Sequence, residues 1–206
     1  MADMVMFVSL TLATFTRATL AQVVSTREAD MAQPTPPTSL AAMEAYADGT
    51  TGQLLLLQLE AAGLGEDAAA AAAASAIGRA AGLASLLRGT LHHAQRRRTF
   101  LPVDLCTAAG IAEEDILTGK DSQAMRDVVR AVASSAHEQL QAAREMQEQL
   151  PPSARLLLMP AVGTGMYLRT LEVKGFNLFD QKMLRGGYSP LAYQLRLKWA
   201  LLRQRF

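Results

Sequence analysis

A long helical pattern near the middle of the chain restricts the fold more than any other feature. It starts at Asp121 or Ser122 and runs to about Leu150, where two prolines are expected to stop it because proline lacks a backbone donor. Its apolar residues recur at intervals of three and four, so one stripe is buried and the other faces are polar. They are Met125, Val128, Val129, Val132, Ala136, Leu140 and Ala143.

The rest of the chain also favours helices over strands. Alanine and leucine are abundant and aromatic residues make up only 5%, a composition that loses little entropy when a helix forms. No run of alternating Val, Ile and Thr predicts a sheet. With 206 residues, of which 50% are hydrophobic, the chain can bury one continuous core. We therefore predict an all-α bundle of about six or seven helices.

Several helix boundaries can be predicted from capping residues and prolines. Ser39 is expected to cap a helix from Leu40 to about Ala62, since its hydroxyl can accept a bond from a free helix amide. Pro160 is expected to kink a later helix. The other expected elements are helices at about 67–90, 104–110, 111–117, 153–171 and 189–206, with a mobile connection around Gly175, Gly186 and Gly187.

Residues 1–37 are predicted to be a tail and a proline-rich linker ahead of the folded part. The stretch 25–40 is mostly polar and contains three closely spaced prolines, which is typical of a linker. The apolar run from Val5 to Phe15 covers about half of the ~20 residues that span a bilayer. It is either the apolar region of a signal peptide or part of an organelle presequence, and the sequence leaves both open.

Charge and cysteine content limit the classes of function. The formal net charge is +1, so the chain has no general attraction for nucleic acid. The single cysteine, Cys106, excludes an internal disulfide framework and agrees with a reducing compartment. We expect Cys106 to be a small buried hydrophobic residue, with a catalytic role as the alternative.

The stretch LRGTLHHAQRRRTFLP at residues 87–102 combines two histidines, three arginines and a Leu-Pro end. It resembles the segment LRDVGEDARRGRIYLP of the squalene/phytoene synthase family. Four other stretches resemble that family in the same order, at residues 43–63, 74–88, 101–117 and 126–144. The resemblance covers residues 38–206 and implies an isoprenoid-synthase-like helical bundle. That bundle is expected to be incomplete, because the family's first helices, with its first aspartate-rich motif, have no counterpart in residues 1–37.

The resemblance places Gly89 and His93 where the family has the two aspartates of its DxxxD metal motif. In the family these carboxylates hold Mg²⁺, which neutralises the charge of the diphosphate leaving group. Glycine has no side chain, and imidazole suits zinc or copper better than magnesium. On a helix His92 points about 100° away from His93, so the two would not chelate one ion. We therefore predict no catalytic residue, no metal site and no cofactor.

Elsewhere in the chain, acidic residues at helical spacing have the pattern of a metal site. Glu44 and Asp48 are four residues apart, but the resemblance places them outside both metal motifs, and we expect them on a solvated helix face. Glu145 and Glu148 are expected to be surface charges. The acidic run at 113–115 is expected to stabilise a helix N-terminus.

Arg96, Arg97 and Arg98 form the clearest cluster of charge. They are candidates for contact with an anion or lipid, since a guanidinium can pair with two phosphate oxygens at once. The alternative is a solvated loop that neutralises helix carbonyls. A second basic stretch, residues 195–205, mixes arginine and lysine with leucine and Trp199. It is expected to pack in the core with a basic outer face, or to lie on an anionic membrane or a partner.

Residues 171–184, LEVKGFNLFDQKML, and the end that bears Trp199 resemble one branch of the family. That branch assists assembly of mitochondrial respiratory complex I (NADH dehydrogenase) and is understood not to transfer prenyl groups. It implies a non-catalytic protein on the matrix side of the inner membrane, which binds complex I assembly intermediates, other assembly factors or lipid. The alternative is an active prenyl transferase that uses prenyl diphosphates and Mg²⁺. A third reading is an incomplete gene product.

Overall fold

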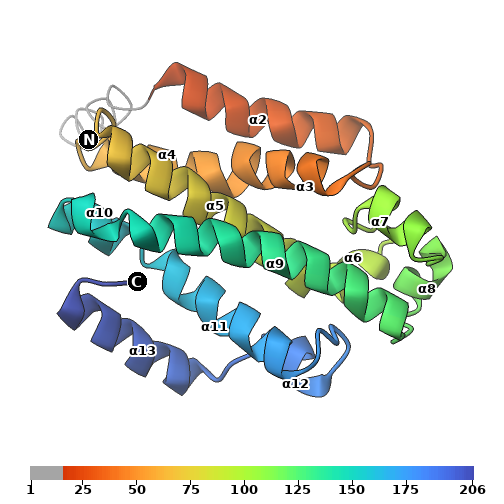
Figure 1. Cartoon of the computed structure of the whole chain (residues 1–206). Helices are drawn as coiled ribbons and strands as arrows, with labels where there is room; N and C mark the ends of the chain where they lie inside the picture. The colour runs from red at the N-terminus through yellow and green to blue at the C-terminus, as the bar shows by residue number, and fades with distance from the viewer. Residues whose placement is uncertain (1–15) are drawn as a thin grey trace, which may run out of the picture.

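The computed structural model describes residues 16–206, and all regular secondary structure in that range is helical (Figure 1). The predicted all-α fold class is therefore confirmed. Two long helices, α5 (Ala68–Arg88) and α9 (Gln123–Glu145), lie side by side at the centre. Helix α5 also contacts the helices on either side of this pair, so it forms the middle of the bundle.

The predicted helix from Leu40 to Ala62 is present, with one irregular turn. It comprises α3 (Leu40–Ala47), a π-helical turn η1 (Asp48–Gly52) and α4 (Gln53–Ala61). The Ser39 hydroxyl accepts a hydrogen bond from the Ala42 amide at 3.2 Å, as predicted for the cap. In η1 the Gln53 amide donates to the carbonyl of Asp48, five residues earlier, which widens the helix locally.

Helix α5 is thin because alanine and glycine make up most of it. A Cβ added at Gly78 would overlap the backbone Cα of Gly52, and a Cβ added at Gly82 would lie 2.5 Å from the Ala47 Cβ. The backbone of α5 can approach η1 and the end of α3 this closely only because Gly78 and Gly82 lack side chains. By length and apolar composition α5 could span a membrane, but most of it is buried inside the bundle, as expected for a core helix.

The long helix α9 matches its prediction closely. All seven residues of the predicted apolar stripe are buried, and the Ser122 hydroxyl caps the helix by accepting a hydrogen bond from the Met125 amide at 3.1 Å. The helix ends at Glu145, a few residues before the two prolines. A short turn η2 (Gln147–Gln149) follows, and Pro152 begins α10 (Pro152–Leu157) instead of only stopping α9. Proline suits the first turn of a helix, where its missing N–H has no partner to lose.

Several connections contain more helix than predicted. The expected kinked helix over 153–171 is two separate helices, α10 and α11 (Pro160–Val173), because Pro160 starts a new helix instead of bending the old one. The connection expected to be mobile around Gly175 and Gly186 includes α12 (Gln181–Leu184). The remaining short helices are α6 (Thr90–Ala94), α7 (Val103–Ala108) and α8 (Glu113–Leu117). The number of helical segments therefore exceeds the six or seven predicted.

The prediction that residues 1–37 form only a tail and linker was wrong for its second half. Residues Arg17–Ala32 form helix α2, which packs against η1 and α4. The Glu60 carboxylate helps to fix its start by accepting hydrogen bonds from the Thr16 amide at 2.7 Å and the Thr19 hydroxyl at 2.9 Å. No residue of α2 is buried. Its larger apolar residues Leu20, Val24 and Met31 are 40%, 53% and 78% exposed, so the helix has no buried apolar stripe. The predicted signal peptide or presequence around Val5 to Phe15 lies outside the described residues.

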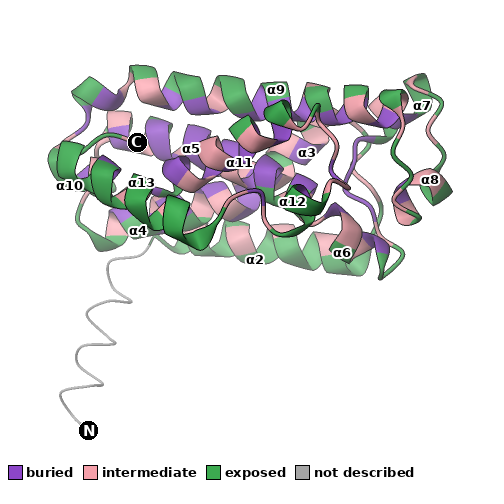
Figure 2. Ribbon diagram, turned by 90° about the horizontal axis from the view of Figure 1, so that it is seen from below, coloured by how far each residue is buried: buried purple, intermediate pink, exposed green. Residues whose placement is uncertain are grey.

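The C-terminal helix α13 (Pro190–Arg203) lies at the edge of the bundle (Figures 1 and 2). Its inner face packs on α11 through a small cluster that includes Ala200 and Leu197. Its outer face is apolar as well. Leu191, Leu195 and Leu202 are 66%, 61% and 84% exposed. The helix was predicted to pack in the core with a basic outer face. Arg196, Lys198 and Arg203 are exposed, as predicted for that face, but most of the leucines lie outside the core, so the predicted core packing was wrong for them.

Candidate functional site

The segment 87–102 lies at the end of α5, where Gly89 joins α5 directly to α6. The His93 side chain, one turn further on, folds back across Gly89. Its Nε2 atom lies 2.8 Å from the position that a Cβ on Gly89 would take. The imidazole therefore fills the space beside Gly89, and a carboxylate at position 89 would collide with it.

The His93 ring is held in place by an aromatic neighbour. It meets Phe100 edge-on with 4.7 Å between ring centroids, and Phe100 in turn packs against Tyr46 at 5.6 Å. Burial lowers the pKa of His93, and repulsion from the nearby guanidinium groups of Arg98 and Arg96 lowers it further. His93 is therefore neutral at neutral pH, and its ring acts as a packing group in this arrangement.

A cluster of polar side chains surrounds this aromatic group and connects it to α2. The Arg98 Nη2 atom lies 2.5 Å from the Asp30 Oδ1 atom, and the guanidinium of Arg98 stacks over the Phe100 ring at 5.1 Å. The Tyr46 hydroxyl donates to Asp30 at 3.3 Å and accepts from Arg27 at 2.6 Å. Burial raises the pKa of Tyr46, while Arg27 opposes that rise. These contacts join α2, α3 and the segment after α6.

The three consecutive arginines point to three different partners. Arg98 pairs with Asp30 as described, Arg97 lies 3.6 Å from Glu114, and Arg96 lies 2.6 Å from the His92 ring nitrogen. Arg97 also has a positive φ of 52°, a left-handed backbone conformation that residues other than glycine rarely adopt. The structure does not bring the three guanidinium groups together, and their contact with an anion or lipid stays a prediction.

Glu44 and Asp48 do not lie on a solvated helix face, so that expectation was wrong. Both are half-buried and each accepts a hydrogen bond from a serine of a neighbouring helix. Ser135 donates to Glu44 at 2.5 Å and Ser75 donates to Asp48 at 2.6 Å. Within residues 16–206 no group of three His, Cys, Asp or Glu side chains is arranged to hold a metal ion.

Cys106 is buried, as predicted. Burial raises the pKa of its thiol to about 11, and the nearby Asp104 carboxylate adds to the rise. The thiol is therefore protonated at neutral pH, which makes it a poor nucleophile.

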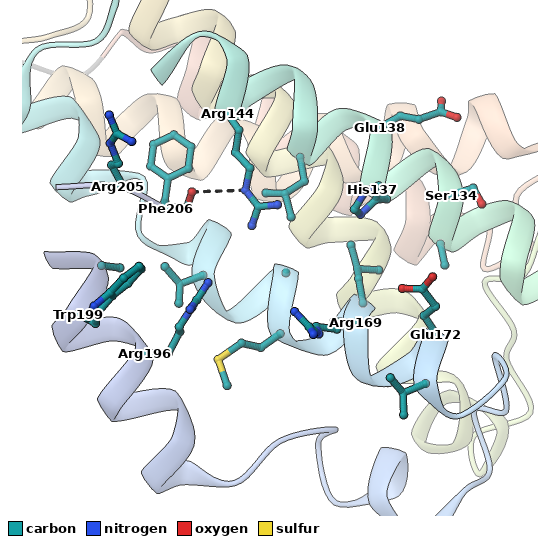
Figure 3. A pocket seen from close by; sticks show the side chains of 18 of the residues that line it. Ser134, His137, Glu138, Arg144, Arg169, Glu172, Arg196, Trp199, Arg205 and Phe206 are labelled. Atoms are coloured by element: carbon teal, nitrogen blue, oxygen red, sulfur yellow. Dashed lines mark hydrogen bonds between the residues drawn. The ribbon is translucent and has the colours of Figure 1, made fainter. Parts of the chain in front are cut away.

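A pocket of about 880 Å³ lies between α9, α11 and α13 (Figure 3). Part of its wall is apolar and comes from Leu140, Val162, Met166, Val173 and Trp199. Four arginines also line it, Arg144, Arg169, Arg196 and Arg205. Arg144 and Arg196 point toward the end of the pocket near Trp199 and Phe206, while Glu172 and His137 lie at the opposite end (Figure 3). No residue of the segment 87–102 lines this pocket.

The arginines of the pocket are only partly neutralised. Arg205 pairs with Glu148 at 2.5 Å, but Arg144, Arg169 and Arg196 form no salt bridge within the described residues. The half-buried Arg144 donates to the main-chain oxygen of Phe206, the last residue of the sequence, at 3.3 Å, and to the side-chain oxygen of Gln141 at 3.4 Å. Burial lowers the pKa of Arg144, and repulsion from Arg196 lowers it further. Arg144 and Arg196 therefore bring two positive charges to one end of the pocket, beside Phe206.

The Asp30–Arg98 pair gives a direct test of how α2 is attached. Asp30→Asn and Arg98→Gln, measured singly and together by chemical denaturation, are expected to show a coupling free energy of about 1 kcal/mol. The side chains are 14% and 29% exposed, so water screens them less than a surface pair. The Glu148–Arg205 pair, with side chains 68% and 62% exposed, is the matched control and should couple by less than about 0.5 kcal/mol. Equal coupling in both cycles would contradict this account of α2.

The sequence carried no signal for two of these features. The α2 side chains Arg27 and Asp30 belong to a helix without a buried apolar stripe, and they lie far along the chain from Arg98. The pocket combines residues of three helices that no local spacing connects. Tyr46 lies in the stretch 43–63 that resembles the family, and no local spacing connects it to Asp30 or Phe100.

Comparison with known proteins gives one family. The family model for squalene/phytoene synthase matches residues 11–198 of this chain. This match includes α2, which the sequence-based prediction left outside the family. A squalene synthase, HpnC of Alicyclobacillus acidocaldarius, superimposes with a TM-score of 0.71 at 18% identity, covering 79% of this chain and 62% of that structure. At this identity the likeness shows a shared fold alone.

Two curated relatives are more similar in sequence. A protein of Bos taurus named NADH dehydrogenase (ubiquinone) complex I, assembly factor 6, is 39% identical over 143 residues, or 69% of this chain and 43% of that protein. The Homo sapiens protein of the same name is 36% identical over 141 residues, or 68% and 42%. The chain thus aligns with less than half the length of these relatives.

Proposed function

Because this chain belongs to the squalene/phytoene synthase family and is similar to members named as complex I assembly factors, we propose that it assists the assembly of mitochondrial respiratory complex I without catalysing prenyl transfer. Its role in this proposal is binding: a helical surface holds an assembly intermediate, another assembly factor or a lipid. The place of action is the matrix side of the inner membrane, where complex I is assembled.

The local structure at Gly89 is the observation that best supports a non-catalytic role. Prenyl transfer of the family's type needs Mg²⁺ to neutralise the departing diphosphate, and paired carboxylates to hold the metal. The resemblance of residues 87–102 to the family places Gly89 and His93 at the positions of that pair. The His93 ring fills the space beside Gly89 and packs on Phe100 at 4.7 Å. A neutral imidazole held against a phenyl ring does not supply the missing negative charge.

Disruption of the gene in its source organism tests the assembly role. Assembled complex I is expected to fall severalfold on native gels and in NADH–ubiquinone activity, while the other respiratory complexes stay at wild-type levels. The reason is that an assembly factor is needed to form this one enzyme. Re-expression of the wild-type chain is the matched control and should restore complex I. Unchanged complex I after complete loss of the protein would overturn the proposal.

An assay for prenyl transfer tests the non-catalytic part of the proposal. Purified protein incubated with farnesyl or geranylgeranyl diphosphate and Mg²⁺ is expected to form no more product than a heat-killed sample. Product above that control would favour the alternative, an active prenyl transferase. Altered sterols or carotenoids in the disrupted strain, with normal complex I, would point the same way.

A further inference from the structure

The C-terminal part of the chain is strongly basic although the whole chain is nearly neutral. The formal net charge of the 206 residues is +1. Residues 181–206 contain no Asp or Glu, while their basic residues are Lys182, Arg185, Arg196, Lys198, Arg203 and Arg205. Positive charge is therefore concentrated on α13 and its flanks, at the edge of the bundle.

Helix α13 presents this charge beside an exposed apolar stripe. Leu191, Leu195 and Leu202 follow one another at intervals of four and seven, so they share one face, and all three are more than half exposed. Trp199 lies between this stripe and the pocket. It is 44% exposed and also lines the pocket. The guanidinium groups of Arg196 and Arg203 lie over its ring, at 5.0 and 4.2 Å from the centroid.

The pocket continues this surface inward. Arg196 belongs to both α13 and the pocket, and it faces the half-buried Arg144. Gly165 of α11 makes room for that arrangement, since a Cβ there would lie 2.9 Å from the Arg144 Nη2 atom. A phosphate between Arg144 and Arg196 would relieve their mutual repulsion. It would compete with the Phe206 and Gln141 oxygens that Arg144 now contacts.

From these features we propose that α13 lies on a bilayer surface and that the pocket takes the phosphate headgroup of an anionic phospholipid between Arg144 and Arg196. The leucines of α13 enter the acyl region, as in interfacial amphipathic helices. Trp199 lies at the headgroup level, where its ring is apolar and its N–H can be solvated. Lys198 lies among the leucines at the same helical spacing, and its long side chain extends back to the headgroups, while Arg203 contacts headgroups beside the stripe. This inference names a lipid as the ligand in the binding role proposed above. It rests on the proposed function only in taking the bilayer to be the mitochondrial inner membrane.

The single tryptophan of the chain makes a direct measurement possible. Trp199 fluorescence of the 206-residue protein is expected to shift to shorter wavelength with vesicles of phosphatidylcholine and phosphatidylglycerol, but not with phosphatidylcholine alone. Brominated acyl chains should quench it, and added salt should weaken the binding by screening the charges. Each basic residue near an anionic surface strengthens binding about fivefold. Arg144→Gln with Arg196→Gln should therefore weaken vesicle binding about 25-fold.

Three further double variants test which surface binds the vesicles. Two of them are on α13 and one is on another surface. Because Arg144 is half-buried, Arg196→Gln with Lys198→Gln provides a second pair on exposed positions, with the same expected loss. Leu195→Ala with Leu202→Ala should weaken binding at least about tenfold. The matched control, Arg96→Gln with Arg97→Gln, removes two exposed arginines elsewhere and should have little effect. Circular dichroism establishes that each variant is folded.

Three results would overturn the proposal. The first is vesicle binding without any change at Trp199, which would assign the contact to another part of the chain. The second is an equal response to neutral and anionic vesicles. The third is an equal or larger loss in the Arg96 and Arg97 variant, which would favour the cluster predicted from sequence. Since the purified protein is used, failure here leaves the complex I assembly role to be judged by gene disruption.

Discussion

Replacement of Gly78 by alanine is expected to destabilise the protein by about 3 kcal/mol or more and to lower its melting temperature by roughly 6–12 °C. An added Cβ would overlap the backbone of Gly52, and neither helix backbone can move away without disturbing the core around α5. The expected direction is opposite to that of helix propensity, since alanine in a helix is favoured over glycine by about 1 kcal/mol. Chemical denaturation of the purified variant measures the difference.

Ser85→Ala is the matched control for this substitution. Ser85 is exposed on the same helix, so the change removes a surface hydroxyl and is expected to alter the free energy of unfolding by less than about 0.5 kcal/mol. A Gly78→Ala protein as stable as wild type would mean that α5 and η1 are further apart than described. A variant that does not fold at all agrees with the expected direction.

Truncation of Leu140 to alanine is expected to lower the free energy of unfolding by about 2–5 kcal/mol. Leu140 is 0% exposed, and it forms part of the wall between the core and the pocket of α9, α11 and α13. The loss has two parts. The three removed carbons no longer contribute their free energy of transfer from water into the core, and a cavity remains where they were. Guanidinium denaturation followed by circular dichroism measures it.

Leu202→Ala removes the same atoms at a position that is 84% exposed. It is expected to change the free energy of unfolding by less than about 0.5 kcal/mol. In combination with Leu195→Ala it is still expected to weaken vesicle binding. A similar loss of stability in both leucine variants would show that α13 is packed more extensively than described.

The fold was largely predictable where helices carry their own local signals. The stripe of α9, the cap at Ser39 and the alanine-rich α5 each follow from residues near one another in sequence, and the structure confirms them. The resemblance to the squalene/phytoene synthase family is also confirmed. Helix α2 was missed because its contacts with η1, α4 and Arg98 are made by half-buried or exposed residues, which leave no buried apolar stripe. Pro152 was expected to stop a helix and Pro160 to kink one, although proline also suits a helix start.

The candidate site was predictable only in part, for a physical reason. The sequence identified Gly89 and His93, since both lie in one short motif. That the His93 ring occupies the space beside Gly89 depends on side-chain packing against Phe100, which spacing alone does not give. The pairing of Arg98 with Asp30 depends on long-range packing. The outer leucines of α13 looked like core residues because a helix with two apolar faces has no single stripe to orient it.

The π-helical turn η1 has a consequence for how chains of this kind can change in length. The wide turn holds one extra residue within a single turn. Loss of one residue between Asp48 and Gly52 would therefore give a regular turn and leave α3 and α4 facing nearly the same way. A deletion in a regular turn of α4 would instead rotate α3 by about 100°, and Met43, which is 1% exposed, would leave the interior. A change of one residue in length is therefore easier to accommodate at η1, or in connections such as residues 33–37, than in the regular turns on either side of η1.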